Sequence, residues 1–168
     1  MTDRTRRVKW TIILSLIAVA LYCLILLFSR MQGELSSAHS MGVTEGIVSF
    51  FEQVFSLDLS YNDSFEQLGA LDAFVRKVAH FTEYALLALP VYAIALLWGK
   101  RRLIAAILPF AAVVSMAAAD EWLQTFVPGR YGSVRDVLLD SAGCLFGMLL
   151  LRLLWKNKEA ARDGKSHL

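Results

Sequence analysis

The sequence predicts an all-α protein, an integral membrane four-helix bundle with an amphipathic extracytoplasmic helix. Of its 168 residues, 57% are hydrophobic, and the mean hydropathy is +0.51. A soluble domain of this length is less apolar and more charged. Four apolar segments approach the roughly 20 residues that a helix needs to cross a hydrocarbon core of about 30 Å. The basic residues gather at the ends of these segments.

We predict membrane helices at residues 10–28, 78–98, 103–127 and 134–155. The third reaches full length only if residues 120–127 continue the helix into the head-group region. The first segment could instead be a cleaved signal peptide, because a patch of small residues follows at 36–38. Its apolar run is longer than the 7–15 residues or so of a typical signal core, which favours a retained helix.

The distribution of Lys and Arg predicts the orientation. Residues 1–9 hold four, the 100–102 turn holds three and residues 156–168 hold four, whereas residues 31–75 hold none. Cytoplasmic loops carry the excess of positive charge in membrane proteins. Both termini are therefore expected in the cytoplasm, and the 31–75 and 120–136 loops are expected outside.

The outer loop, residues 29–75, is acidic. Within it, apolar residues recur near helical spacing over about 43–57, which predicts an amphipathic helix lying on the bilayer or capping the bundle. This helix could be a lid over a site. It could also simply cover apolar surface, an interpretation that the ordinary role of loops favours.

Ionisable residues at three helix ends mark a candidate site, because such groups are costly in a membrane segment. On the second helix, Lys77, His80 and Tyr84 share one face at spacings of three and four residues, with Glu83 beside them. They could form a charge relay or an anion site. They could also form an interfacial belt in which Lys77 snorkels and the ring side chains lie at head-group depth. The belt does not account for Glu83.

The third helix ends with two carboxylates and an amide, Asp120, Glu121 and Gln124. Gln124 lies four and three residues from the carboxylates and can hydrogen-bond either one. Adjacent residues diverge by about 100° on a helix, so only one carboxylate is expected to face the interior. We predict that both matter and that Glu121 is the less exchangeable.

The fourth helix begins after the turn at Pro128-Gly129. Ser133 is placed to cap it, and Asp136 lies at the capping-box spacing. Asp140, one turn deeper, must be neutral or must pair with a residue such as Arg130, Lys77 or His80. An internal ion pair that serves folding is the alternative interpretation.

Gly143 and Gly147 continue the Asp140 face as a G-x-x-x-G pattern. Small residues at this spacing permit close contact with another helix. A second copy of the chain is one possible partner for this surface.

Taken together, the motifs at residues 77–84, 120–130, 133–136 and 143–147 resemble those of the VanZ-like family. These are small bacterial membrane proteins named for a teicoplanin-resistance determinant. The resemblance covers residues 74–155, and Asp140 stands where the family commonly has Asn. It implies a function in the cell envelope, with lowered glycopeptide susceptibility as one candidate effect, but it implies no mechanism.

The first functional hypothesis is an envelope protein that binds a lipid-linked or peptidoglycan-related anion at the outer leaflet, among the membrane lipids. The basic side chains would hold its phosphate or carboxylate. The candidate ligand-binding residues are Lys77, Tyr84, Asp120, Gln124, Arg130, Ser133, Arg135 and Asp140. Nucleic acid is a poor candidate partner, because the net charge is only +2.

The second hypothesis is a membrane hydrolase or transferase acting on a lipid head group or polyprenyl carrier. His80 would be its base or nucleophile, oriented by Glu83 or Asp136. The candidate catalytic residues are His80, Glu83, Glu121 and Asp136. No resident cofactor or metal is predicted, although a divalent cation among Glu121, Asp136 and Asp140 would suit their oxygen ligands. A transporter or scramblase is less favoured, because four crossings show no inverted repeat.

Overall fold

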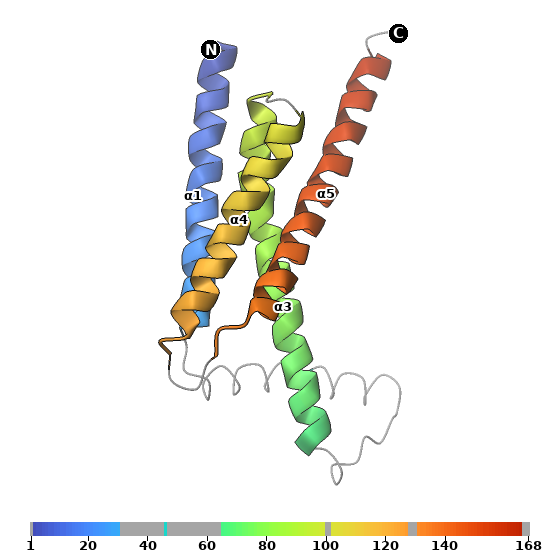
Figure 1. Ribbon diagram of the computed structural model, residues 1–168. Coiled ribbons are helices and arrows are strands. Elements are labelled where there is room, and N and C mark those ends of the chain that lie inside the picture. Colours follow the sequence, from blue (N-terminus) through green and yellow to red (C-terminus); the bar gives the residue numbers. More distant parts are fainter. Residues whose placement is uncertain (1, 31–45, 47–64, 100–101, 128–130, 166–168) are drawn as a thin grey trace.

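A computed structural model of the chain describes residues 2–30, 46, 65–99, 102–127 and 131–165. They form four helices, α1 (Asp3–Ser29), α3 (Phe65–Leu97), α4 (Arg102–Gln124) and α5 (Val134–Lys165) (Figure 1). The described residues contain no strand, so the predicted all-α fold is confirmed. The predicted amphipathic helix at 43–57 lies outside the described residues, apart from Gly46.

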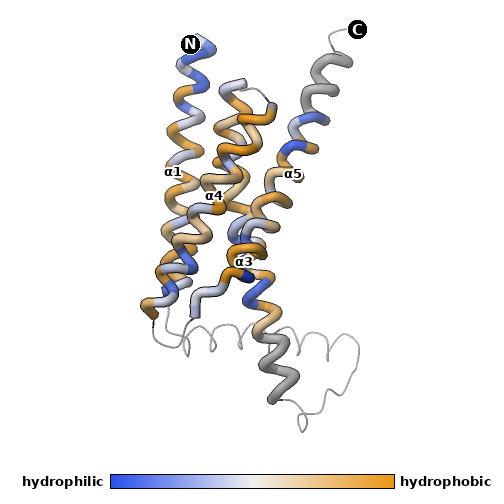
Figure 2. Tube along the Cα trace, viewed as in Figure 1, coloured by the Kyte–Doolittle hydropathy of each residue, from blue (hydrophilic) through white to orange (hydrophobic). Residues whose placement is uncertain are grey.

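The four helices run alternately up and down the bundle. The start of α1, the end of α3, the start of α4 and the end of α5 lie at one end of it (Figure 1). Each helix contains a stretch long and apolar enough to cross a membrane, within Asp3–Ser29, Ala73–Leu97, Leu103–Gln124 and Val134–Lys156. Figure 2 shows that hydrophilic residues gather at the start of α1 and towards the end of α5.

The helices do not end where the apolar segments end. α3 begins at Phe65, ahead of the predicted segment 78–98, and α5 continues to Lys165, beyond residue 155. α4 ends at Gln124 instead of residue 127, because the backbone N–H groups of residues 125–127 bond to carbonyls only three residues back. Apolar length predicts which part of a helix can lie in hydrocarbon, whereas caps and turns decide where the helix stops.

α3 packs most extensively against α5, and glycine makes this contact possible. A Cβ atom on Gly143 would meet the backbone carbonyl oxygen of Phe81, and one on Gly147 would meet that of Ala85. The two helices therefore touch backbone to backbone, as small residues at this spacing allow. α3 of the same chain fills the G-x-x-x-G surface, so a second copy docking through these glycines would have to displace it.

The interior of the bundle is filled from all four helices. Tyr84 and Leu87 from α3, Val113 from α4 and Cys144 from α5 are almost completely buried, and α1 adds Ile25. Large apolar side chains also cover the outside of each helix, including Leu16, Leu86, Leu108 and Leu149. An apolar exterior of this kind suits contact with lipid chains.

The α3–α5 contact predicts a large effect of side-chain volume at Gly147. Gly147→Val should lower the unfolding midpoint in detergent by about 5 °C or more, since forcing bulk into a close contact typically costs 1–3 kcal/mol or so. Ala142→Val, at an exposed position on the same helix, is the matched control. Circular dichroism against temperature measures both variants. Equal midpoints would contradict the close contact.

Candidate functional site

Among the residues that the structure describes, five polar ones are buried at the end of the bundle opposite the chain termini. They are Ser29, Asp120, Glu121, Gln124 and Asp140, each no more than 5% exposed. With Tyr84 and His80 of α3 they form what we call the polar cluster. All four helices contribute to it. The structure thus brings together predicted site residues from α3, α4 and α5 and adds a residue from α1.

Asp120 joins three helices. Its Oδ2 atom accepts hydrogen bonds from Ser29 Oγ of α1 at 2.7 Å and from Gln124 Nε2 of α4 at 3.3 Å. It also accepts a longer one from the Tyr84 hydroxyl of α3 at 3.4 Å. A buried carboxylate needs such donors to offset the loss of water. These hydrogen bonds therefore hold α1, α3 and α4 together around the Oδ2 atom of Asp120.

Glu121 joins α4 to the start of α5. Its Oε1 accepts from Gln124 Nε2 at 3.1 Å, and its Oε2 accepts from the backbone N–H of Ser133 at 2.8 Å. The approach is close, since a Cβ atom on Gly132 would collide with the backbone carbonyl oxygen of Glu121. A change at residue 121 would therefore disturb the beginning of α5.

Ser133 caps α5 as predicted, and Glu121 completes the cap from another helix. Ser133 Oγ accepts from the Arg135 N–H at 3.2 Å, and its carbonyl accepts from Val137. In a capping box the acid three residues on would accept from the Ser133 N–H. Glu121 takes that place, and Asp136 accepts instead from Lys77 Nζ at 3.2 Å.

The expectation that only one of the two adjacent carboxylates faces inward is wrong. Asp120 is 0% exposed and Glu121 is 5% exposed. The divergence of about 100° between them is real, but α4 has neighbours on both sides. Asp120 points towards α1 and α3, and Glu121 points towards His80 and the start of α5.

His80 lies beside the buried carboxylate of Asp140. Its Nδ1 is 3.8 Å from Oδ1 of Asp140, which is 0% exposed. Neither oxygen of Asp140 accepts a hydrogen bond from the described residues. Of the three predicted partners of Asp140, the structure places His80 beside it. Lys77 pairs with Asp136, and Arg130 lies outside the described residues.

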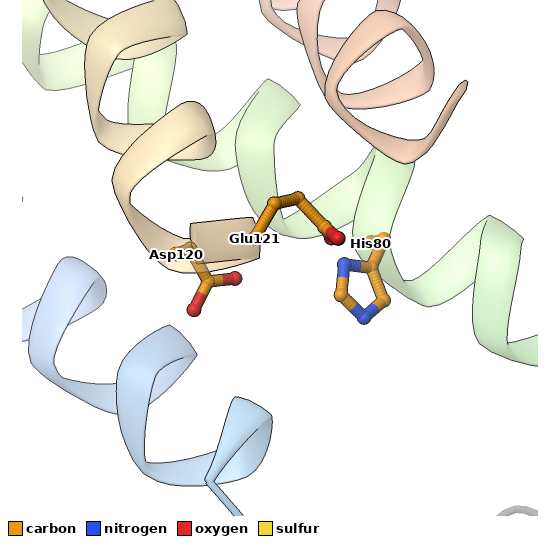
Figure 3. Close-up of side chains that lie close together, drawn as sticks. All are labelled: His80, Asp120 and Glu121. Carbon is orange, nitrogen blue, oxygen red and sulfur yellow. The ribbon is translucent and has the colours of Figure 1, made fainter. Parts of the chain in front are cut away.

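One group of side chains has the composition and spacing of a metal site. Ligand atoms of His80, Asp120 and Glu121 all lie within 4.8 Å of one another (Figure 3). This group shares only Glu121 with the predicted oxygen set of Glu121, Asp136 and Asp140, because His80 and Asp120 take the place of the two other carboxylates. The side chain of Asp136 turns instead towards Lys77 at the exposed rim.

The remaining predicted residues lie around the cluster. The Lys77 side chain is 56% exposed, Arg135 is exposed and Glu83 is half-buried. Sequence reasoning missed Ser29, which it passed over as the end of an apolar segment. The only signal was a hydroxyl residue in front of Arg30 at the boundary of that segment.

Comparison with known protein families identifies a relationship over most of the chain. A family model described as VanZ/LLP1 matches residues 14–155, which span most of the chain and take in all four helices. No match was found among curated proteins or among solved structures.

The hydrogen bonds of Asp120 predict a structural role for Ser29. Ser29→Ala should lower the free energy of unfolding by about 1–2 kcal/mol, because a buried carboxylate loses its shortest hydrogen bond. The control is Ser115→Ala, whose exposed hydroxyl donates to the carbonyl of Ala111 in its own helix. Thermal unfolding in detergent compares the two variants. A Ser29 variant as stable as the Ser115 variant would show that the bond to Asp120 contributes little.

Proposed function

This chain belongs to the VanZ/LLP1 family, and we propose that it is a multi-pass protein of the bacterial cell envelope that binds an anionic ligand at the outer leaflet of the inner membrane. The ligand is the phosphate or carboxylate of a lipid-linked or peptidoglycan-related molecule. One observation carries the proposal. The polar cluster is gathered at a single end of an otherwise apolar bundle, with Lys77 and Arg135 exposed near it.

The exposed cations suit an anionic head group. The Lys77 and Asp136 side chains are 56% and 33% exposed, and ion pairs accessible to solvent contribute only about 0–1 kcal/mol. A phosphate can therefore replace Asp136 as the partner of Lys77 at little cost. Arg135, next to Asp136 in the first turn of α5, offers the planar fork that binds phosphate or carboxylate through two parallel hydrogen bonds.

The buried acids have a different role in this proposal. Asp120 and Glu121 accept hydrogen bonds from the helices around them, and Glu121 holds the start of α5 in place. Lys77 lies on α3 and Arg135 lies on the first turn of α5. The acids thereby set the separation of the two cations that would contact the ligand.

The proposed orientation places both termini in the cytoplasm. The start of α1, the end of α5 and the facing ends of α3 and α4 lie at one end of the bundle (Figure 1), and the clustered basic residues belong to that end. The positive-inside rule assigns such an end to the cytoplasm. The polar cluster then faces the outer leaflet.

A membrane enzyme acting on a lipid head group or polyprenyl carrier is the second candidate, favoured by the geometry of His80. The carboxylate of Asp140, 3.8 Å from Nδ1, can orient the imidazole and stabilise its protonated form. The imidazole would then act as a general base towards water or a second substrate. The two candidate functions share the same ligand. They differ in that an enzyme would convert the ligand to a product, whereas a binding protein would leave it unchanged.

Removing the two exposed cations should weaken ligand binding. We expect the double variant Lys77→Ala/Arg135→Ala to bind a short-chain prenyl phosphate about 10-fold or more weakly in nanodiscs, because charge-assisted hydrogen bonds contribute roughly 1.5–3 kcal/mol each. Microscale thermophoresis measures the affinity. The matched control, Arg152→Ala/Lys156→Ala, removes the same charge further along α5.

Equal affinity for both double variants, or no binding by the wild type, would rule out this anion site. Conversion of the prenyl phosphate by wild type but not by His80→Ala would establish the enzyme. In cells, a deletion strain complemented with His80→Ala, Glu121→Gln or Arg130→Ala should be more susceptible to teicoplanin than the same strain complemented with wild type. Immunoblots must show equal membrane levels.

Reporter fusions test the orientation. A fluorescent protein fused after Leu168 should fluoresce, because it folds in the cytoplasm. Alkaline phosphatase fused at the same position should be inactive, because it does not become active in the cytoplasm. Phosphatase fused within residues 31–60 should be active. The reverse pattern would place the polar cluster on the cytoplasmic side.

A further inference from the structure

Three side chains of the polar cluster converge in a way that the hydrogen bonds alone do not require. His80 from α3 and Asp120 and Glu121 from α4 bring one potential ligand atom each to within 4.8 Å of the other two. Figure 3 shows the Glu121 carboxylate directed at the His80 ring, with Asp120 beside them. We propose that these three residues form a binding site for one divalent transition-metal ion, zinc or manganese.

A buried oxygen atom without a donor supports the site independently. Asp120 is 0% exposed, and its Oδ1 accepts no hydrogen bond from the described residues, although its Oδ2 accepts three. Ser29 holds Oδ2 on the α1 side. In Figure 3 the other oxygen points to the side on which Glu121 and His80 lie. Burying a carboxylate oxygen without a partner is unfavourable, and a cation at this position removes that penalty.

The donor set indicates the class of metal. Carboxylates suit magnesium, calcium and manganese, whereas an imidazole suits zinc, copper, iron and nickel. A set of one imidazole and two carboxylates therefore fits zinc, and it fits manganese through its two carboxylates. Imidazole nitrogen and carboxylate oxygen lie about 2.0–2.2 Å from zinc, so atoms within 4.8 Å of one another can close on one ion by small side-chain rotations. The two carboxylates carry a charge of −2, which a divalent ion neutralises.

The surrounding groups orient the proposed ligands. Tyr84, Ser29 and Gln124 hold Asp120, and Gln124 with the Ser133 N–H holds Glu121. Outer hydrogen bonds of this kind fix ligand geometry in known metal sites. Three protein ligands leave a coordination position open for water, as in catalytic zinc sites. Asp140 lies beside His80, and its oxygens accept no hydrogen bond from the described residues.

Metal binding to the purified protein tests the proposal. Protein in detergent, stripped with EDTA, is titrated with Zn²⁺ and with Mn²⁺ by calorimetry, and with Co²⁺ by visible absorption. We expect one ion per chain and a higher unfolding midpoint with the ion bound. His80→Ala and Asp120→Asn should each weaken metal binding by about 10-fold or more. Even the residues that hydrogen-bond to metal ligands typically change metal affinity by about 10-fold or more when they are replaced.

Asp136→Asn is the control, because it removes a carboxylate from the same end of the bundle but outside the proposed site. It should bind the ion as the wild type does. Wild-type protein that takes up none of the three ions would overturn the proposal. So would folded His80 and Asp120 variants with wild-type affinity, or an Asp136 variant that loses as much affinity as they do. The Co²⁺ spectrum of the wild type does not depend on whether any variant folds.

The ion site goes beyond the proposed anion binding and stands or falls separately from it. The metal-binding test contains no prenyl phosphate. The anion-binding test changes the side chains of Lys77 and Arg135, which are not ligands of the proposed metal ion. Failure of one experiment therefore leaves the other conclusion in place.

Discussion

The structure depends on the hydrogen bonds that two neighbouring carboxylates accept in the buried interior of the bundle. Asp120 and Glu121 are adjacent in the chain, so they leave α4 in directions about 100° apart. Asp120 takes donors from α1 and α3, whereas Glu121 takes one from the start of α5. A carboxylate buried in an apolar bundle must find such donors within the protein. Two consecutive residues thereby connect α4 to every other helix.

The same arrangement separates the roles of the polar residues. Asp120, Glu121 and Gln124 are buried and hydrogen-bonded, both to one another and to neighbouring helices. Lys77 and Arg135, which can reach a ligand from outside, lie at the rim. Asp140 is as buried as Asp120, and it lies beside His80, which is partly exposed. A ligand held at this end of the bundle by Lys77 and Arg135 would therefore lie next to buried, hydrogen-bonded polar side chains.

The fold was predictable from the sequence because helix formation in a membrane depends on a local property, apolar length. The four segments, the cap at Ser133 and the close contact at Gly143 and Gly147 all follow from patterns within one segment. The motifs that carry the family resemblance also placed most of the candidate site on the correct helices. The length of α3 and α5 beyond the bilayer is not encoded in hydropathy.

The pairing within the site was less predictable, because it depends on how each helix is rotated about its axis. Ser29 and Asp120 are 91 residues apart, and Lys77 and Asp136 are 59 apart. No periodicity within a segment relates such residues. The assignment of Asp136 to the cap failed for this reason, since Glu121 from another helix reaches the Ser133 N–H first.

The order of synthesis gives the cap of α5 a consequence for assembly. The donors of Asp120 lie on α1, α3 and α4, which all leave the ribosome before α5. Glu121 can bond to Gln124 at that stage, but its second partner is the backbone of Ser133, which comes later in the chain. The first three helices can thus complete their polar contacts as a unit. Arrival of the last helix adds the bond from Ser133 to Glu121 and the ion pair of Lys77 with Asp136, so Glu121 would join α5 to three helices that are already connected.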